Sequence, residues 1–172
     1  MKIQSVEDLF LVELQYIYGA EQQLVQSLPE LAQAACAPQL REVFEQHLQD
    51  TKEHVRRIED TFKSIGVPAQ AQPNAVIKQL RQEAQQMIEN IEKSELRDAA
   101  LIIVGNQVEH YEMSAYGSLR TFAQLLGHEE AIGILQKTLD EEKKADAKLT
   151  EVGESQINIQ ALHKSAAAMA AS

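Results

Sequence analysis

The sequence predicts an all-α protein folded as a four-helix bundle. Apolar residues recur at alternating spacings of three and four along four long segments, which places them on one face of a helix. The 172-residue chain also has only 7 glycines and 4 prolines, and this composition favours long helices. The length suits one domain with a sizeable core.

Capping and stop signals give the expected ends of the first two helices. Ser5 followed by Asp8 resembles a capping box, so we expect the first helix from there to about residue 35, with a kink near Pro29. Pro38 suits the first turn of the second helix, and Gly66 ends that helix.

The second half of the chain is expected to contain one short helix and two long ones. Residues 67–74 read as a loop and residues 75–92 as a short amphipathic helix. Ser94 is expected to cap the third long helix, which ends at Gly127. The fourth long helix is expected over residues 129–153.

The lengths of the connections predict the topology. The links between the first and second and between the third and fourth long helices are short, so each pair should form an antiparallel hairpin. About thirty residues, including the short helix, join the hairpins, which is enough to carry the chain back along the bundle. This is the ferritin-like arrangement with one long crossover. We expect the bundle to occupy residues 1–153 and an Ala/Ser-rich tail to occupy residues 154–172.

Charge and hydropathy argue against several classes of partner. The formal net charge of -10 argues against nucleic acid or an anionic membrane, because both require a basic surface. The longest apolar run, residues 99–104, is too short to cross a bilayer. The single cysteine, Cys36, fits a reducing compartment, and no signal segment is recognised, so a cytoplasmic location is expected.

All four long helices carry acidic or histidine side chains within their apolar faces. Glu21 interrupts the first apolar face, Glu112 the third and Glu142 the fourth, while the second contains His47 and His54. A buried carboxylate without a partner is very costly. Acids that meet at one level of a bundle therefore need a cation, shared protons or a dense hydrogen-bond network.

A di-metal site is one answer. In bundles of this kind, two helices each give one Glu and the other two each give a Glu-x-x-His pair. Glu21 and Glu112 fit the single-Glu positions. The second helix reads Thr51-x-x-His54 and the fourth has Glu142 without its histidine, so one expected Glu and one expected His are missing.

The candidate metal ligands are seven acidic and histidine residues: Glu21, Asp50, His54, Glu109, Glu112, Glu142 and Asp146. This set is rich in oxygen donors, which favours Mn or weakly held Fe as the cofactor. Two choices stay open: Glu141 or Glu142, and His47 or His54. His47 could instead orient a carboxylate, and one of the four tyrosines could donate to the acids. The structural alternative is that the acids lie at helix edges and reach water.

Five short stretches resemble the YciF/YciE-type stress-protein family, whose members are ferritin-like bundles related to rubrerythrin. The matching stretches are residues 20–24, 47–51, 96–100, 108–112 and 139–146. The resemblance implies a cytoplasmic homodimer with a metal site of undefined activity. It also implies that Glu109 is the extra acid of rubrerythrin-like proteins, and that Asp50 stands where relatives usually have Glu.

Two classes of function are compatible with these features. The first is a metal-binding stress-response protein that slowly oxidises its metal or reduces peroxide or oxygen. The residues beside the acids are small, so we expect space there for an oxygen or peroxide molecule; they are Gly19, Ala20, Ser114 and Ala115. The alternative is a non-enzymatic dimeric stress or assembly protein with a vestigial or structural metal site, and with another ferritin-like protein as a partner.

Overall fold

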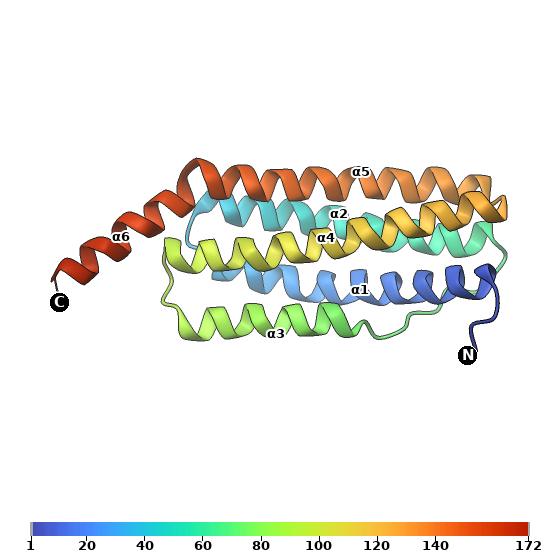
Figure 1. Cartoon of the computed structure of the whole chain (residues 1–172), viewed down its shortest axis with the longest axis horizontal. Helices are drawn as coiled ribbons and strands as arrows, with labels where there is room; N and C mark the ends of the chain where they lie inside the picture. Colours follow the sequence, from blue (N-terminus) through green and yellow to red (C-terminus); the bar gives the residue numbers. More distant parts are fainter. Residues whose placement is uncertain (1, 172) are drawn as a thin grey trace.

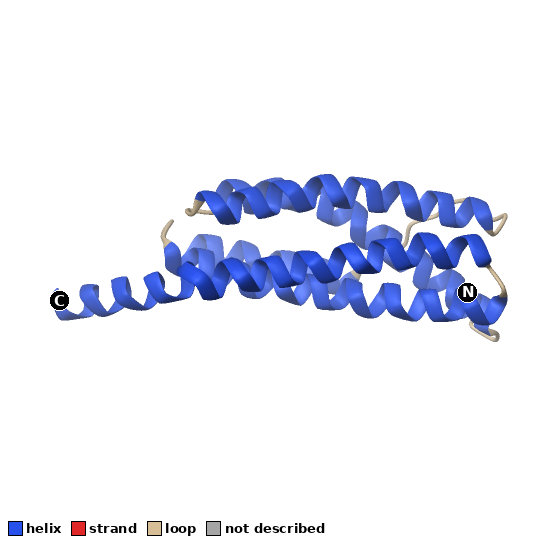
Figure 2. Cartoon of the chain, turned by 90° about the horizontal axis from the view of Figure 1, so that it is seen from above, coloured by secondary structure: helices blue, strands red, loops and turns tan. Residues whose placement is uncertain are grey.

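The computed structural model describes residues 2–171 and confirms the all-α prediction, since the described part of the chain contains no strand. The helices are α1 (Val6–Ala34), α2 (Pro38–Ser64), α3 (Ala75–Asn90), α4 (Glu95–Leu126), α5 (Glu129–Val152) and α6 (Asn158–Ala171), with a π-helical turn η1 (Gly153–Ile157) between the last two. Figure 2 shows this helical chain from above, with the C-terminal helix extending past the end of the bundle. None of the described helices is long and apolar enough to span a membrane.

The four long helices form two antiparallel hairpins, α1 with α2 and α4 with α5 (Figure 1). The hairpins pack together through α1 against α4 and α2 against α5. The linker after α2 and helix α3 lie along α1 and α4 and return the chain to the end of the bundle where α4 starts (Figure 1). This is the predicted ferritin-like topology with a long crossover that carries an extra short helix.

Hydrogen bonds at the N-terminal ends of α1 and α2 fix where these helices begin. Ser5 and Asp8 form the predicted capping box at the start of α1. The start of α2 has no cap of its own; instead the fully buried Asp98 of α4 accepts hydrogen bonds from the N–H groups of Cys36 and Ala37, both at 2.7 Å. One carboxylate therefore ties the two hairpins together and satisfies two amides that would otherwise lack a partner.

The loop between α2 and α3 crosses α1 at Gly19. A Cβ at Gly19 would lie 1.8 Å from the carbonyl oxygen of Gln72, and the Gln72 N–H donates to the Gln15 carbonyl at 2.9 Å. Glycine is required here by the close approach of the loop. The space expected beside Gly19 for an oxygen or peroxide molecule is therefore filled by the loop backbone.

One predicted feature of the helix ends is incomplete and another is wrong. The fourth long helix, α5, ends at Val152 with Gly153 as its C-cap, as predicted, but Gly153 keeps helical φ and ψ of -63° and -52° and the chain continues through η1 into α6. A Cβ at Gly153 would meet Ile102 at 3.5 Å, so the glycine allows close packing on α4. Ser94 occupies the N-cap position of α4, but its hydroxyl donates to the Glu92 carbonyl and caps nothing.

Candidate metal centre

Six buried polar side chains meet near the middle of the bundle, between layers of apolar side chains. Each of the four long helices contributes at least one of them, because the three-four apolar pattern of each helix is interrupted at this level. They are Glu21 from α1, His47 and His54 from α2, Glu109 and Glu112 from α4, and Glu142 from α5; all are 5 % exposed or less. We call these six residues the acid–histidine cluster.

The cluster divides into two groups with donor atoms close enough to share an ion. One group joins His47, Glu109, Glu112 and Glu142, and the other joins Glu21, His54 and Glu142; within each, one donor atom per residue lies within 4.8 Å of all the others. Glu142 belongs to both groups. Each group could therefore hold a cation.

The individual contacts are short but poorly aligned for hydrogen bonding. His54 Nδ1 lies 2.9 Å from Glu142 Oε1 and 3.6 Å from Glu21 Oε1. His47 Nε2 lies 3.2 Å from Glu109 Oε1. Neither His54 Nδ1 nor His47 Nε2 forms a hydrogen bond, because the distances are short but the angles are unfavourable.

The described residues contain ten buried side-chain nitrogen and oxygen atoms without a hydrogen-bond partner, and nine of them belong to the cluster. Both oxygens of Glu112 and both of Glu142 are among the nine. Such atoms are rare in folded proteins because each one loses its hydration without compensation. Carboxylate oxygens with two imidazole nitrogens are donors that Fe and Mn accept, so the residues present fit a divalent cation.

A polar chain links His54 to the protein surface. His54 Nε2 lies 3.0 Å from Glu141 Oε2, and Arg57 approaches the same carboxylate with contacts of 2.5 and 3.1 Å. Burial alone would raise the pKa of Glu141, but hydrogen bonds from Arg57 and His54 outweigh it and lower that pKa. Glu141 therefore stays charged and fixes the orientation of the imidazole, as carboxylates beside metal-binding histidines commonly do.

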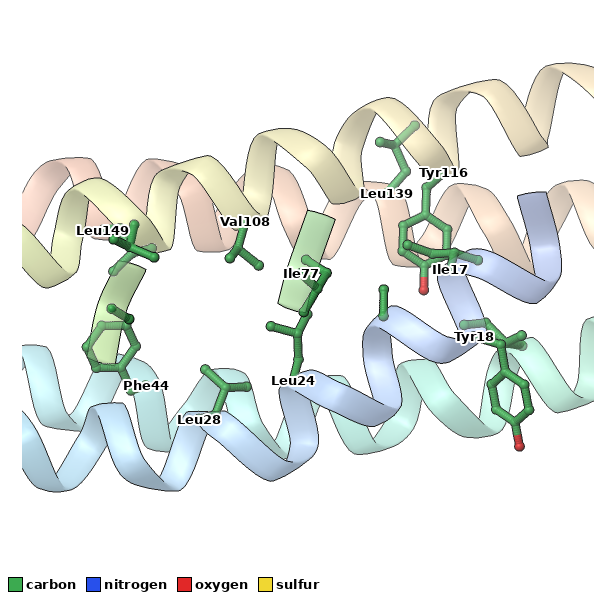
Figure 3. Packing of buried hydrophobic residues seen from close by; sticks show 14 of the residues in the cluster. Ile17, Tyr18, Leu24, Leu28, Phe44, Ile77, Val108, Tyr116, Leu139 and Leu149 are labelled. Carbon is green, nitrogen blue, oxygen red and sulfur yellow. The ribbon is translucent and has the colours of Figure 1, made fainter. Parts of the chain in front are cut away.

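For the first open choice, the structure places Glu142 in the cluster and Glu141 at its rim, against His54 Nε2. The expectation that a tyrosine donates to the acids is confirmed. The hydroxyl of the buried Tyr116 donates to Glu21 Oε1. Figure 3 shows Tyr116 reaching from α4 into the bundle, whereas Tyr18 points its hydroxyl outward.

Three carboxyl groups of the acid–histidine cluster have raised pKa values. Burial, reinforced by the charges of Glu142 and Glu21, raises the pKa of Glu109 and of Glu112 well above the usual range. Burial also raises the pKa of Glu142, to about 7, although the neighbouring His54 opposes this rise. Protons retained by these carboxyl groups therefore reduce the repulsion among them.

The two histidines are shifted in opposite directions. Burial and the nearby His54 charge lower the pKa of His47 to about 3, so this imidazole is neutral and can offer a lone pair. Burial would also lower the pKa of His54, but Glu142 and Glu21 outweigh it and raise that pKa to about 11. A cation bound at His54 Nδ1 would have to displace its proton.

Two predicted ligands lie outside the cluster. Asp50 is half-buried, and its carboxylate accepts a hydrogen bond from Gln46 at 3.1 Å on the exposed side of α2. The carboxylate of Asp146 accepts from Asn106 at 2.9 Å and lies 3.1 Å from the exposed ring of His110. Both carboxylates are held by polar neighbours near the surface.

The residue that sequence reasoning undervalued is His47, which lies in the cluster itself. The signal for it was present, because His47 and His54 are seven residues apart and so lie two turns apart on one face of α2. The structure thus brings together five of the seven predicted ligands and adds His47, which supplies the second nitrogen donor.

Comparison with known proteins identifies the family of this helical bundle. The sequence model of a family described as a domain of unknown function, DUF892, matches residues 5–162. The chain belongs to the DUF892 family. The family match extends beyond residue 153, the expected end of the bundle, and includes η1 and the first residues of α6.

Two known proteins resemble this chain over most of its length. It is 38% identical over 165 residues to the protein YciF of Escherichia coli strain K12, covering 95% of this chain and 99% of YciF. The crystal structure of that stress protein matches with a TM-score of 0.87, covering 91% of this chain and 99% of the other. YcfI, described as a candidate structural protein from Rhodopseudomonas palustris, matches with 35% identity and a TM-score of 0.84, covering 87% and 95% of the two chains.

Proposed function

We propose that this DUF892 protein is a stress-response protein that binds divalent transition metal, Fe or Mn, at the acid–histidine cluster. The observation that carries the proposal is the concentration of nine unpartnered buried donor atoms where four helices meet. Uncompensated polar atoms in a core are costly, so this concentration favours a bound group that would partner them.

The donor groups suggest how two ions would be held. Glu21, His54 and Glu142 would hold one ion, and His47, Glu109 and Glu112 would hold the other with Glu142 between them. Bound Fe or Mn would supply one-electron oxidation and reduction, which carboxylates and imidazoles cannot. The chain's own part is to fix the donors: Tyr116 holds Glu21, and Glu141 with Arg57 holds the ring of His54.

A second candidate function is structural, with the cluster kept as a proton-sharing network and no turnover. The description of the Rhodopseudomonas palustris relative as a candidate structural protein favours it. The raised pKa values of Glu109 and Glu112 also favour it, because protons can reduce repulsion among the acids without a metal. Metal content separates the two functions.

The test is a metal titration of chelator-treated protein, with Mn(II) as the probe and the melting temperature as the measurement. We expect the melting temperature to rise with Mn(II) concentration, because an ion that binds only the folded state stabilises it. Glu112→Gln should weaken Mn(II) binding by about tenfold or more, about 1.4 kcal/mol.

Asp50→Asn is the matched control, because it removes the same charge from a carboxylate that lies outside the cluster. This variant should bind Mn(II) as the wild type does. If neither Mn(II) nor Fe(II) raises the melting temperature, the metal function is wrong and the structural function stands. Equal loss of binding in both variants would contradict the assignment of donors.

A further inference from the structure

A long groove opens onto the acid–histidine cluster between α2 and α5. Its volume is about 720 Å³, and its walls come from the first half of α2, the second half of α5 and the turn η1. Its lining includes Val43, His47 and Ala145. The groove therefore leads from solvent to a histidine of the cluster.

A small cavity lies on the inner side of the same three residues. Its volume is about 20 Å³, and Val43, His47 and Ala145 line both the groove and this cavity. Val43 and Ala145 are half-buried and line both spaces, so they lie where the groove adjoins the cavity. Glu109, whose Oε1 lies 3.2 Å from His47 Nε2, also lines this cavity and connects it to the acids.

The rest of the cavity lining is apolar. Figure 3 shows Leu28, Phe44, Val108 and Leu149 projecting from four different helices into the space that the cavity occupies. His47 and Glu109 are the polar residues of the lining, and they lie where the cavity meets the cluster. A buried water needs two to four polar partners and space of about 10–15 Å³ for its centre, so the volume suffices for one small molecule but most of the wall offers water no partner.

We propose that this cavity is a binding site for dioxygen and that the groove between α2 and α5 is its entrance, with Val43 and Ala145 as the gate. The inference rests on the proposed metal function, because a metal would occupy the donor atoms of His47 and Glu109 and leave an apolar chamber. A diatomic, uncharged molecule fits such a chamber in size and polarity, whereas peroxide would lose its hydrogen bonds to water there. The opening lies on the α2–α5 side of the bundle, away from the Gly19 region that Gln72 covers.

The test uses chelator-treated full-length protein and the paramagnetism of dissolved dioxygen. Methyl protons of Leu28 and Leu149, which are 3 % and 2 % exposed, should relax faster under dioxygen pressure than those of Leu135, which is 1 % exposed but lines neither the groove nor the cavity. Ala145→Leu fills the gate, so the excess relaxation should fall to the level of Leu135. Ala147→Leu is the matched control, because it makes the same change on the exposed side of α5 and should leave the excess unchanged.

Different results would overturn the dioxygen site and the metal function. No excess at the cavity methyls of the wild type, or an undiminished excess in Ala145→Leu, would overturn the dioxygen site. Excess relaxation in a protein that binds neither Mn(II) nor Fe(II) would leave the cavity assigned and overturn the metal function alone. With Fe(II) bound at matched free iron, Ala145→Leu should slow the oxidation of Fe(II) by dioxygen while Ala147→Leu matches the wild type.

Discussion

At the scale of single residues, the balance between protons and metal in the cluster gives a pH dependence with a definite sign. The folded-state pKa values of Glu109, Glu112 and His54 are raised, and that of Glu142 is about 7. These groups keep protons in the folded protein that the unfolded chain has lost, so the free energy of unfolding of metal-free protein should fall as the pH rises. The lowered pKa of His47 acts in the opposite sense, but only between about 3 and its ordinary value of 6.5.

We therefore expect the melting temperature of chelator-treated protein to fall steadily above pH 6.5, as His54 and the acids lose the protons that the fold has retained. With saturating Mn(II) the slope should be reversed or flat, because metal binding requires the deprotonated donors. The measurement is a thermal melt at several pH values with and without Mn(II). A melting temperature that rises above pH 6.5 without metal would contradict the assignment of shared protons.

The residue scale also shows where sequence reasoning reaches its limit. Periodicity placed Glu21, Glu112 and Glu142 correctly, because a residue in the middle of an apolar face must point at the core. It could not exclude Asp50, which is one residue before the fully buried Thr51 and so lies about 100° around the helix. Such edge positions are decided by the rotation of the helix in the bundle, which depends on contacts far away in the sequence.

At the scale of the elements, substitutions of one glycine in α1 and one in α4 test the close approach of the loop after α2 to α1. Gly19→Ala should lower the free energy of unfolding by about 1–3 kcal/mol, because its Cβ would overlap the Gln72 carbonyl oxygen and the loop would have to move. Gly117→Ala is the control, since nothing lies within 4 Å of its Cβ position, and it should stabilise α4 by about 0.5–1 kcal/mol. Denaturant unfolding measures both changes, and equal effects of the two would argue against the loop crossing at Gly19.

The C-terminal helix is the element that the sequence predicted least well. Its sequence lacks a clear amphipathic pattern, and Gly153 was interpreted as a stop, yet Ile157 and Ala161 are buried where η1 and α6 pack on α4. Glycine signals a stop when the backbone takes positive φ, as Gly127 does at 73°, and sequence alone does not distinguish that use from close packing.

This packing predicts a contrast between two substitutions in the same segment. Ile157→Ala should cost about 2 kcal/mol or more of stability, because it removes a side chain that is 3% exposed. Leu162→Ala should change the free energy of unfolding little, since Leu162 is 68% exposed. Chemical denaturation of both variants checks the contrast, and two neutral substitutions would mean that this segment does not pack on the bundle in solution.

At the scale of the whole molecule, the fold was predictable because short and long connections leave few ways to arrange four helices. The expected homodimer and the division at residue 153 stay predictions, since both depend on surfaces that periodicity does not describe. The position of the cluster has a further consequence for the molecule. Its donors come from α1, α2, α4 and α5, so a bound ion would crosslink both hairpins at their middle, whereas the described residues of α3 and α6 contribute no donor.

Metal binding should therefore slow local opening unevenly across the chain. Amide hydrogen exchange with and without Mn(II) should show added protection around the donors of α1, α2, α4 and α5 and little change in α3 and α6, because an ion opposes only those openings that separate its ligands. Glu112→Gln should reduce the added protection, while Asp50→Asn should keep it. Protection confined to one hairpin would show that the ion binds there alone, and the assignment of donors across four helices would be wrong.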